Sequence, residues 1–170
     1  MVCAAGAIGQ LRELYITTTI AFTISSVYAA ARAVAINMIN FKTYQEGDIL
    51  TWQQVNLVHE IRNGIYQKNG RLKSLLTDFG RINPCYPDTH GVSDDIILYT
   101  GNGRRGDQKL DAQNRALLDA VGMSESVPLF NKLAPGEWRY MGTWRVTDAV
   151  YVFEAKQDRM VWRFTLVRDG

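Results

Sequence analysis

Residues 99–118 read YTGNGRRGDQKLDAQNRALL and place a glycine-rich loop with two arginines directly before a predicted helix. Such a loop can cradle a phosphate, form part of a basic surface for nucleic acid, or make a tight turn. A Walker phosphate loop requires Lys and then Ser or Thr after its last glycine, and here Asp107 and Gln108 follow Gly106. The glycines also match GxGxxG, but the βαβ repetition of a dinucleotide-binding domain does not follow them. The basic surface and the tight turn are the interpretations that remain.

Residues that bind metals are few and scattered in this sequence. The two cysteines, Cys3 and Cys85, and the two histidines, His59 and His90, form no CxxC pair, HExxH motif or Cys/His cluster. The sequence therefore predicts neither a structural zinc site nor a histidine-metal nuclease centre. Two cysteines do not make a disulfide scaffold, which favours a reducing compartment.

The formal net charge is only +2 over 170 residues, so an anionic partner has to be met by a local patch. One basic run lies between residues 62 and 81, where the only acid is Asp78; its members are Arg62, Lys68, Arg71, Lys73 and Arg81. This run is either part of a nucleic-acid surface or a solvated face of the protein.

The N-terminal segment differs in texture from the rest of the chain. Residues 14–31, LYITTTIAFTISSVYAAA, are eighteen residues without a charge, which is long enough for a membrane helix. Six of them are Ser or Thr, however, and the preceding Arg12 and Glu13 do not make the basic start of a signal peptide. We expect a helical appendage over residues 1–40, no membrane insertion, and a second domain over residues 41–170. Met38 is an alternative start.

After residue 40, short apolar runs with glycines and aromatics between turn signals predict a β-rich domain. Strands are expected over residues 48–58, 96–100, 127–130, 138–153 and 160–168, with a bend in the long one at Gly142 or near Asp148 and a hairpin tip in EAKQDRMVW. A helix is expected over residues 107–121, with Asp107 as its N-cap. The predicted class is α+β.

Five separated elements occur in a fixed order along the chain: YTGNG followed by arginine, DQKLDAQNRAL, VPLF, WRYMGTWRV and VWRFTLVR. This set resembles the SRA (SET- and RING-associated) domain, whose core carries YTG-x-GG-R, DQ-x-L-x-x-x-N-x-AL, a PV strand, an RYDG-type strand and a closing W-R-[YF] strand. The resemblance is good over residues 86–168, weaker over residues 47–85 and absent over the first forty.

The resemblance implies a PUA-like bent β-barrel with flanking helices, without a cofactor and without catalytic residues. SRA domains bind duplex DNA and flip a 5-methylcytosine, or sometimes a 5-hydroxymethylcytosine, into a pocket. Bacterial members are commonly joined to nucleases that cut modified DNA, and eukaryotic members occur in chromatin proteins. The expected partners are therefore double-stranded DNA with a modified cytosine and a nuclease effector domain, in a prokaryotic cytoplasm or a eukaryotic nucleus.

By the same resemblance, Tyr99 and Thr100 line the pocket of the flipped base and Tyr86 stacks on its other face. Stacking contributes about 1–3 kcal/mol per base and offsets the cost of flipping. Asp88 is the expected acceptor for the cytosine amino group, which offers only donors. The spacing after Tyr86 differs from the family pattern, so the alternatives for the acceptor are Asp94 and Asp95.

The resemblance also implies which residues touch DNA. In HEIRNGIYQ, Arg62 or Asn63 lies at the tip of the loop that fills the space left by the flipped base. A second family loop, between the GG-R and DQ elements, is nearly deleted here, so the chain departs from the members that read CpG sites. Further expected DNA contacts are Asn102, Arg104, Arg105 and Lys109. Arginine contacts to phosphates would make binding sensitive to salt.

Two other functions compete with DNA reading. Asp148, Glu154 and Lys156 mimic the acidic-x-Lys strand motif that holds Mg²⁺ in many restriction enzymes, which would make the chain a modification-dependent endonuclease. A PUA-like barrel can also serve as an interaction module for RNA or protein, because fold does not determine function. Tyr86 and Asp88 lying far from Tyr99 would favour that module.

Overall fold

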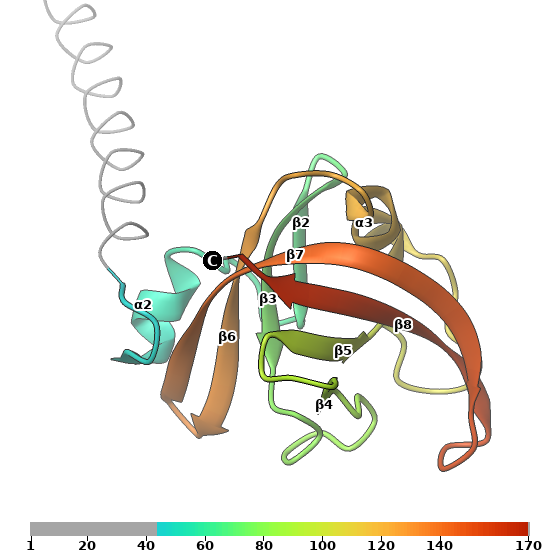
Figure 1. Ribbon diagram of the computed structural model, residues 1–170. Helices are drawn as coiled ribbons and strands as arrows, with labels where there is room; N and C mark the ends of the chain where they lie inside the picture. Colours follow the sequence, from blue (N-terminus) through green and yellow to red (C-terminus); the bar gives the residue numbers. More distant parts are fainter. Residues whose placement is uncertain (1–43, 170) are drawn as a thin grey trace, which may run out of the picture. The chain divides into compact units, whose positions relative to one another are not determined.

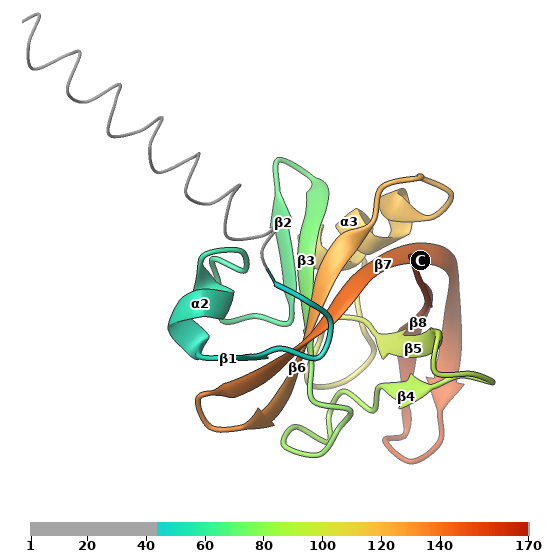
Figure 2. The same cartoon turned by 60° about the vertical axis from the view of Figure 1, so that its left-hand side comes forward.

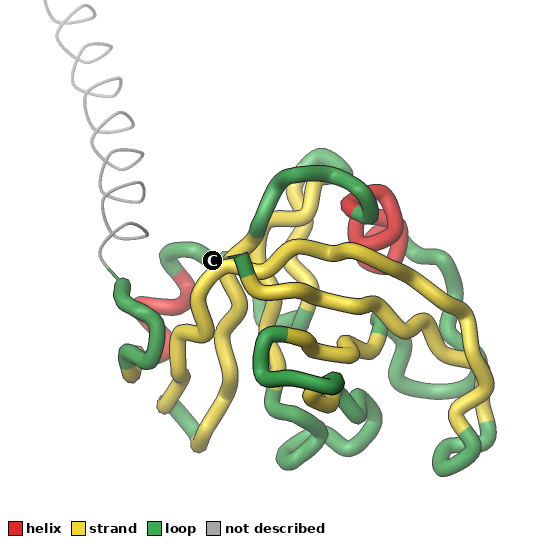
Figure 3. The backbone as a smooth tube through the Cα atoms, in the orientation of Figure 1, coloured by secondary structure: helices red, strands yellow, loops and turns green. Residues whose placement is uncertain are grey.

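In the computed structural model, which describes residues 44–169, eight strands form one mixed sheet with two short helices beside it (Figures 1 and 3). The strands are β1 (Ile49–Leu50), β2 (Ile65–Lys68), β3 (Arg71–Thr77), β4 (Thr89–His90), β5 (Ile96–Thr100), β6 (Val127–Ala134), β7 (Glu137–Glu154) and β8 (Arg159–Arg168). The helices are α2 (Trp52–Asn56) and α3 (Ala112–Ala120).

The strand order is β2-β3-β6-β7-β8-β5-β4, and β1 pairs with the start of β7 beside α2 (Figure 2). Only β3 and β6 run parallel among the strands that the structure describes; the other pairs are antiparallel. No pairing joins the outer strands β2 and β4 within residues 44–169, so the sheet is strongly curved but open (Figure 1). The α+β class predicted from the sequence is confirmed.

The longest strand, β7, pairs with β6 over its first half and with β8 over its second half. The register with β8 shifts between Val146 and Asp148, and Gly142 has a φ of +79°, so the strand bends in the region expected from the sequence. A four-residue turn after Glu154 leads back into β8, with Asp158 at a φ of +49°. The predicted hairpin tip is confirmed.

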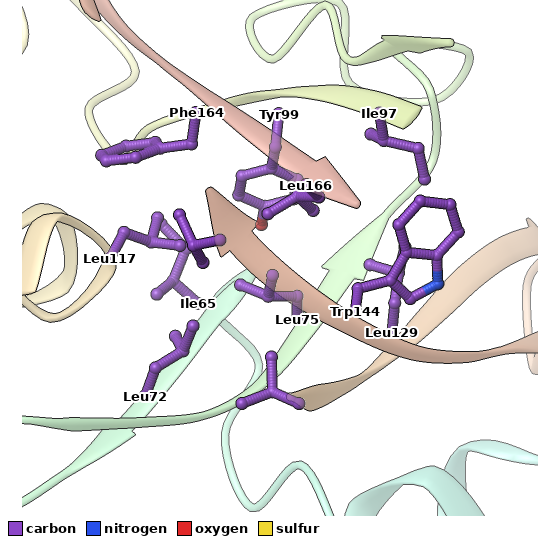
Figure 4. Close-up of a cluster of buried hydrophobic side chains, with 12 residues drawn as sticks. Ile65, Leu72, Leu75, Ile97, Tyr99, Leu117, Leu129, Trp144, Phe164 and Leu166 are labelled. Carbon is purple, nitrogen blue, oxygen red and sulfur yellow. The ribbon is translucent and has the colours of Figure 1, made fainter. Parts of the chain in front are cut away.

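Two hydrophobic clusters hold the sheet together. The larger contains Tyr99, Leu117 and Trp144 and joins β5 and β8 to β2, β3 and α3 (Figure 4). The smaller contains Val55, Phe130 and Trp138 and packs α2 against β6 and β7. Burial of apolar side chains of this size stabilises a fold by about 1.5–3 kcal/mol each.

The sequence predicted Asp107 as the N-cap of α3, but the N-cap in the structure is Asp111. The Asp111 carboxylate accepts the Asn114 N–H at 2.9 Å, three residues into the helix. Asp107 instead accepts the Met160 N–H at 2.8 Å and fastens the loop to β8. Both aspartates precede the same apolar pattern in the sequence. Asp107 contacts β8, which leaves Asp111 to cap the helix.

The strand predicted over residues 48–58 is wrong. Thr51 and Gln54 form a capping box that starts α2, and the strand part shrinks to the two residues of β1. The hairpin of β2 and β3 was not predicted, because its short runs lack the sustained alternation that identifies a strand.

The predicted appendage over residues 1–40 and the uncharged run at residues 14–31 lie outside the described residues. Between residues 44 and 169, no helix has the length and apolar character required to cross a membrane.

Candidate functional site

A cavity of about 280 Å³ opens where the two hydrophobic clusters meet. Its walls include Ile65 and Tyr99 from the larger cluster and Leu76 and Trp138 from the smaller one. Ordinary ligand pockets begin at about 300 Å³, so this space suits a single small planar group. The remaining lining residues are Arg62, Asn63, Gly64, Thr77, Asp78, Ile82, Asn83, Tyr86, Asp88, Thr100, Gly101, Asn102 and Lys132.

All four predicted base-binding residues lie at this cavity. Tyr99 and Thr100 arrive on β5, and Tyr86 and Asp88 arrive on the loop that precedes β4. The two segments are joined directly, because the Asp88 Oδ1 atom accepts the Thr100 N–H at 2.7 Å. Tyr86 and Asp88 therefore lie beside Tyr99.

Asp88 is the carboxyl group of the cavity whose pKa is shifted by its surroundings. Its side chain is only 4% exposed, and its Oδ2 atom accepts the Thr77 hydroxyl at 2.7 Å. Burial raises the pKa of Asp88 to about 7, although the Thr77 and Thr100 hydrogen bonds and the Arg163 charge oppose the rise. The carboxylate already accepts from the Thr77 hydroxyl, the Thr100 N–H and the Thr100 side chain. Of its roughly four lone-pair sites, about one is therefore left for a further donor.

Arg163 on β8 links the acidic loop to the end of β5. Its Nη1 atom donates to the Thr100 Oγ1 atom at 2.6 Å and to the Pro87 carbonyl at 3.0 Å, and its Nη2 atom donates to the Glu154 carboxylate at 2.7 Å. The planar guanidinium suits this many partners better than a lysine would. Arg163 is not among the site residues predicted from the sequence, although it is the arginine of the VWRF motif.

The two tyrosines of the cavity differ in how deeply they are buried. Tyr99 is 3% exposed, and its hydroxyl lies 3.1 Å from the Gly64 carbonyl and 3.0 Å from the Leu76 carbonyl, to which it donates (Figure 4). It forms part of the floor and cannot leave without breaking the core. Tyr86 is half-buried on a loop and forms an outer wall.

A buried histidine holds the loop that carries Arg62 and Asn63. The His59 Nε2–H group donates to the Asn63 carbonyl at 2.6 Å, which leaves Nδ1 to accept the Ser74 hydroxyl at 2.7 Å. Burial lowers the pKa of His59 to about 4, so the ring is neutral. Both predicted loop residues line the cavity mouth, and the Arg62 guanidinium also lies over the Trp52 ring at 5.1 Å.

The glycine-rich loop after Thr100 is a tight turn held by two buried amide side chains. Gln108 donates to the Gly101 carbonyl at 2.6 Å and accepts the Trp162 N–H at 2.8 Å. Asn114 on α3 accepts the Asn102 N–H at 2.6 Å and donates to the Asn102 carbonyl at 2.9 Å. These bonds explain why the motif requires Gln and Asn six residues apart.

Gly101 has no room for a side chain. A Cβ atom there would lie 2.6 Å from the Asn114 Oδ1 atom and 2.9 Å from the Gln108 Oε1 atom. We expect Gly101→Ala to lower the free energy of unfolding by about 1–3 kcal/mol, because the overpacking pushes both amides off their partners. The urea midpoint measures the loss.

The matched control is Gly106→Ala in the same loop, where the φ is +63° and no atom lies within 4 Å of the added Cβ. This control bears backbone strain only, of about 1–2 kcal/mol. A midpoint for Gly101→Ala equal to that of the wild type would contradict the packing argument.

The remaining predicted DNA contacts are divided among three places. Asn102 lines the cavity, but its Nδ2 atom donates to Asp111 at 2.7 Å and is engaged in the loop. Arg104 and Arg105 are exposed and line a separate shallow hollow, with Pro84, Cys85, Gly106, Gln157 and Arg159. Lys109 is exposed and lines neither the cavity nor this hollow.

The basic run between residues 62 and 81 is partly neutralised. Lys68 lies 3.7 Å from the Glu60 carboxylate, and Arg71 lies 2.6 Å from Glu125. Arg81 donates to the Lys132 carbonyl at 3.1 Å, close to the cavity wall. The run is therefore not one continuous DNA-facing patch.

The alternative acceptors and the alternative metal ligands lie elsewhere. Asp94 and Asp95 are exposed, do not line the cavity, and Asp95 is paired with Arg168 at 2.8 Å. Asp148 and Glu154 stand six residues apart on β7, about 20 Å for an extended strand, and Glu154 is occupied by Arg163. No group of three or more His, Cys, Asp or Glu side chains within residues 44–169 could hold a metal ion.

Sequence reasoning also missed the wall residues Thr77, Lys132 and Trp138. Lys132 and Trp138 face each other across the β6–β7 pair, with the Lys132 Nζ atom 5.6 Å from the indole ring centre. A basic residue opposite a tryptophan on a hairpin has no motif of its own, so only the three-dimensional arrangement reveals it.

Solved structures with a similar fold include SRA domains. The SUVH5 SRA domain in complex with hemimethylated CG DNA superposes with a TM-score of 0.64 at 23% identity, over 75% of this chain and 90% of that one. The SUVH5 SRA domain bound to fully hydroxymethylated CG DNA superposes with a TM-score of 0.60 at 22% identity, over 75% of this chain and 91% of that one. The modification-dependent restriction endonuclease TagI superposes with a TM-score of 0.62 at 20% identity, over 75% of this chain and 50% of the TagI chain. These likenesses confirm the PUA-like fold.

Curated proteins gave no match. The family model for ScoMcrA-like SRA domains, in contrast, matches residues 61–168. That segment contains β2 to β8, α3 and all the residues that line the cavity. It is well over half of the 170 residues. By this match and by its fold, the chain belongs to the ScoMcrA-like SRA domain family.

Proposed function

We propose that this chain binds duplex DNA containing 5-methylcytosine or 5-hydroxymethylcytosine and holds the modified base, flipped out of the helix, in the 280 Å³ cavity. The observation that carries the proposal is the buried Asp88 carboxylate at a cavity walled by Tyr86 and Tyr99. A cytosine edge presents an amino donor to such an acceptor. The SRA structures with methylated and hydroxymethylated DNA support the assignment of the ligand class.

The free energies of base flipping and methyl burial explain why the cavity has to fit the modified base closely. Flipping a base costs a few kcal/mol, and two stacking faces together with one hydrogen bond to a charged group offset that cost. Burying a methyl group contributes only about 0.8 kcal/mol, or a fourfold preference. Selectivity beyond that depends on how closely the cavity walls enclose the C5 substituent.

Titration of three duplexes that differ only in one base, cytosine, 5-methylcytosine or 5-hydroxymethylcytosine, tests this function. Fluorescence anisotropy at two salt concentrations reports affinity, and we expect the modified duplexes to bind more than about fourfold tighter. A fluorescent base analogue beside the modified cytosine should brighten as its neighbour unstacks. Equal affinities for all three duplexes would contradict the proposal and favour a PUA-like module with another ligand.

Arg104 and Arg105 are proposed to contact phosphates. Replacing both by alanine should reduce the slope of log K against log salt by about 2, because each neutralised phosphate contributes about 0.9. The loss should be equal for modified and unmodified duplexes. Arg71→Ala, which removes a guanidinium paired with Glu125, is the matched control. An unchanged slope in the double variant would place these arginines away from DNA.

Under this proposal the chain acts as a binding domain without catalysis of its own. A nuclease effector would turn recognition into cleavage, and the TagI endonuclease, half of whose chain is matched, supports that kind of partner. The expected compartment is one that contains DNA, either a prokaryotic cytoplasm or a nucleus.

A further inference from the structure

The second half of β7 presents an open strand edge, which we call the β7 edge and define as residues 147–154. Pairing with β6 ends at Trp144, whereas pairing with β8 continues to Glu154. In an antiparallel ladder, alternate residues of an outer strand direct their N–H and C=O groups away from the sheet. Within residues 44–169, no other strand pairs with them (Figure 1).

The side chains of the β7 edge are unusual for a strand that stays single. Four consecutive apolar residues are exposed: Val150 at 43%, Tyr151 at 41%, Val152 at 37% and Phe153 at 60%. Natural edge strands are normally protected by lysines, prolines or short length. Here the charged residues are Asp148 and Glu154, near the two ends of the edge, so both the backbone and the apolar side chains between them favour addition of a strand.

Other exposed apolar residues do not form such a stripe. Ile49, Ile82, Val92 and Met123 belong to different segments of the chain, and isolated apolar residues are normal on protein surfaces. The β7 edge differs because its apolar residues are contiguous and coincide with unpaired backbone groups.

We propose that the β7 edge pairs with the β7 edge of a second copy of this chain, antiparallel about a two-fold axis, so that one sheet runs through both subunits. An axis at Val150 sets Ala149 opposite Tyr151 and Asp148 opposite Val152 of the second copy. An axis at Tyr151 would set Asp148 against Glu154, which like charges disfavour. An axis at Val152 would run into the turn after Glu154.

This pairing suits a homodimer because a two-fold interface has to be self-complementary. The sequence TDAVYVFE satisfies that condition at the Val150 register, since every opposed pair contains at most one charge. No residue of the β7 edge lines the base cavity. The proposal therefore stands independently of the ligand assigned to the cavity.

Sedimentation equilibrium of the full chain across the micromolar range tests the proposal. We expect a mass twice the 19.2 kDa of one chain at the upper end of the range. Val150→Lys should sediment as a single chain, because two ammonium groups meet on the axis. Val92→Lys, at a valine that is 98% exposed in the turn before β5, makes the same charge change and should keep the dimer.

A wild-type chain that stays monomeric, a larger open-ended assembly, or a Val150→Lys variant that keeps the dimer mass would each overturn the proposal. Hydrogen exchange gives a second measurement: protection of the amides at residues 147–154 should increase with protein concentration. Protection already complete in the monomer would mean that another segment of the same chain covers the edge, and would also overturn it. Urea midpoints confirm that both variants fold.

Discussion

Asp88→Asn is expected to weaken binding to duplex DNA with a modified cytosine by about 5- to 150-fold and to leave unmodified DNA nearly unaffected. The carboxamide keeps an oxygen for the Thr100 N–H, but it places an NH2 donor where the other oxygen accepts the Thr77 hydroxyl, and it offers the cytosine amino group one acceptor oxygen fewer. An unmet buried donor costs about 1–3 kcal/mol, which converts to that range of affinity. Fluorescence titration with matched duplexes measures it.

The same substitution should remove a dependence of binding on pH. Because burial raises the pKa of Asp88 to about 7, the wild-type side chain loses its charge and one acceptor oxygen as pH falls below 7. Affinity for the modified duplex should therefore drop by up to about tenfold per pH unit below pH 7 and level off above it. The carboxamide of the Asp88→Asn variant does not titrate, so the affinity of that variant should stay flat over this range.

Stability should respond to pH in the opposite direction. Between its ordinary pKa of 3.8 and its folded pKa of about 7, Asp88 holds a proton in the folded chain that the unfolded chain has released. Its contribution is complete below pH 3.8 and is lost as pH rises through 7, by an amount on the order of 4 kcal/mol. Urea midpoints of wild type and Asp88→Asn, compared across this window, should diverge accordingly.

The matched control is Asp94→Asn, which changes an exposed carboxylate six residues away that does not line the cavity. Its affinity and its pH profile should match those of the wild type. If Asp94→Asn lost selectivity and Asp88→Asn kept it, the acceptor would be assigned to the wrong loop residue.

Tyr86→Ala should weaken binding to the modified duplex by about 5- to 150-fold as well, for a different reason. Loss of one aromatic face removes about 1–3 kcal/mol of stacking from the flipped base. Tyr86 is half-buried on a loop, so its removal leaves the core intact, whereas Tyr99 is buried within the larger cluster. The outer wall is therefore the one that can be tested without unfolding the domain.

Tyr86→Phe separates stacking from hydrogen bonding, because it keeps the ring and removes the hydroxyl. We expect it to bind like the wild type, and we expect the brightening of the neighbouring base analogue to be lost only in Tyr86→Ala. An equal loss of affinity for modified and unmodified duplexes would show that Tyr86 contacts the DNA backbone rather than an extruded base.

Local chemistry along the chain was sufficient to predict several features. The hairpin tip after Glu154 and β5 were predicted at or near their observed positions, and a tight turn was one of two interpretations of the glycine-rich loop, because turns and short apolar strands depend on neighbouring residues. The ordered motifs indicated the family, and through it the four residues that the structure brings to one cavity.

Tertiary structure decided what depends on contacts between distant segments. Asp107 and Asp111 both looked like caps, and only the contact of Asp107 with β8 separated them. Arg163 became part of the site because β8 lies beside β5, more than sixty residues away in sequence. The raised pKa of Asp88 likewise comes from burial between segments. Side chains acquire such roles when packing removes water and sets their partners, and a linear sequence does not record which partners those are.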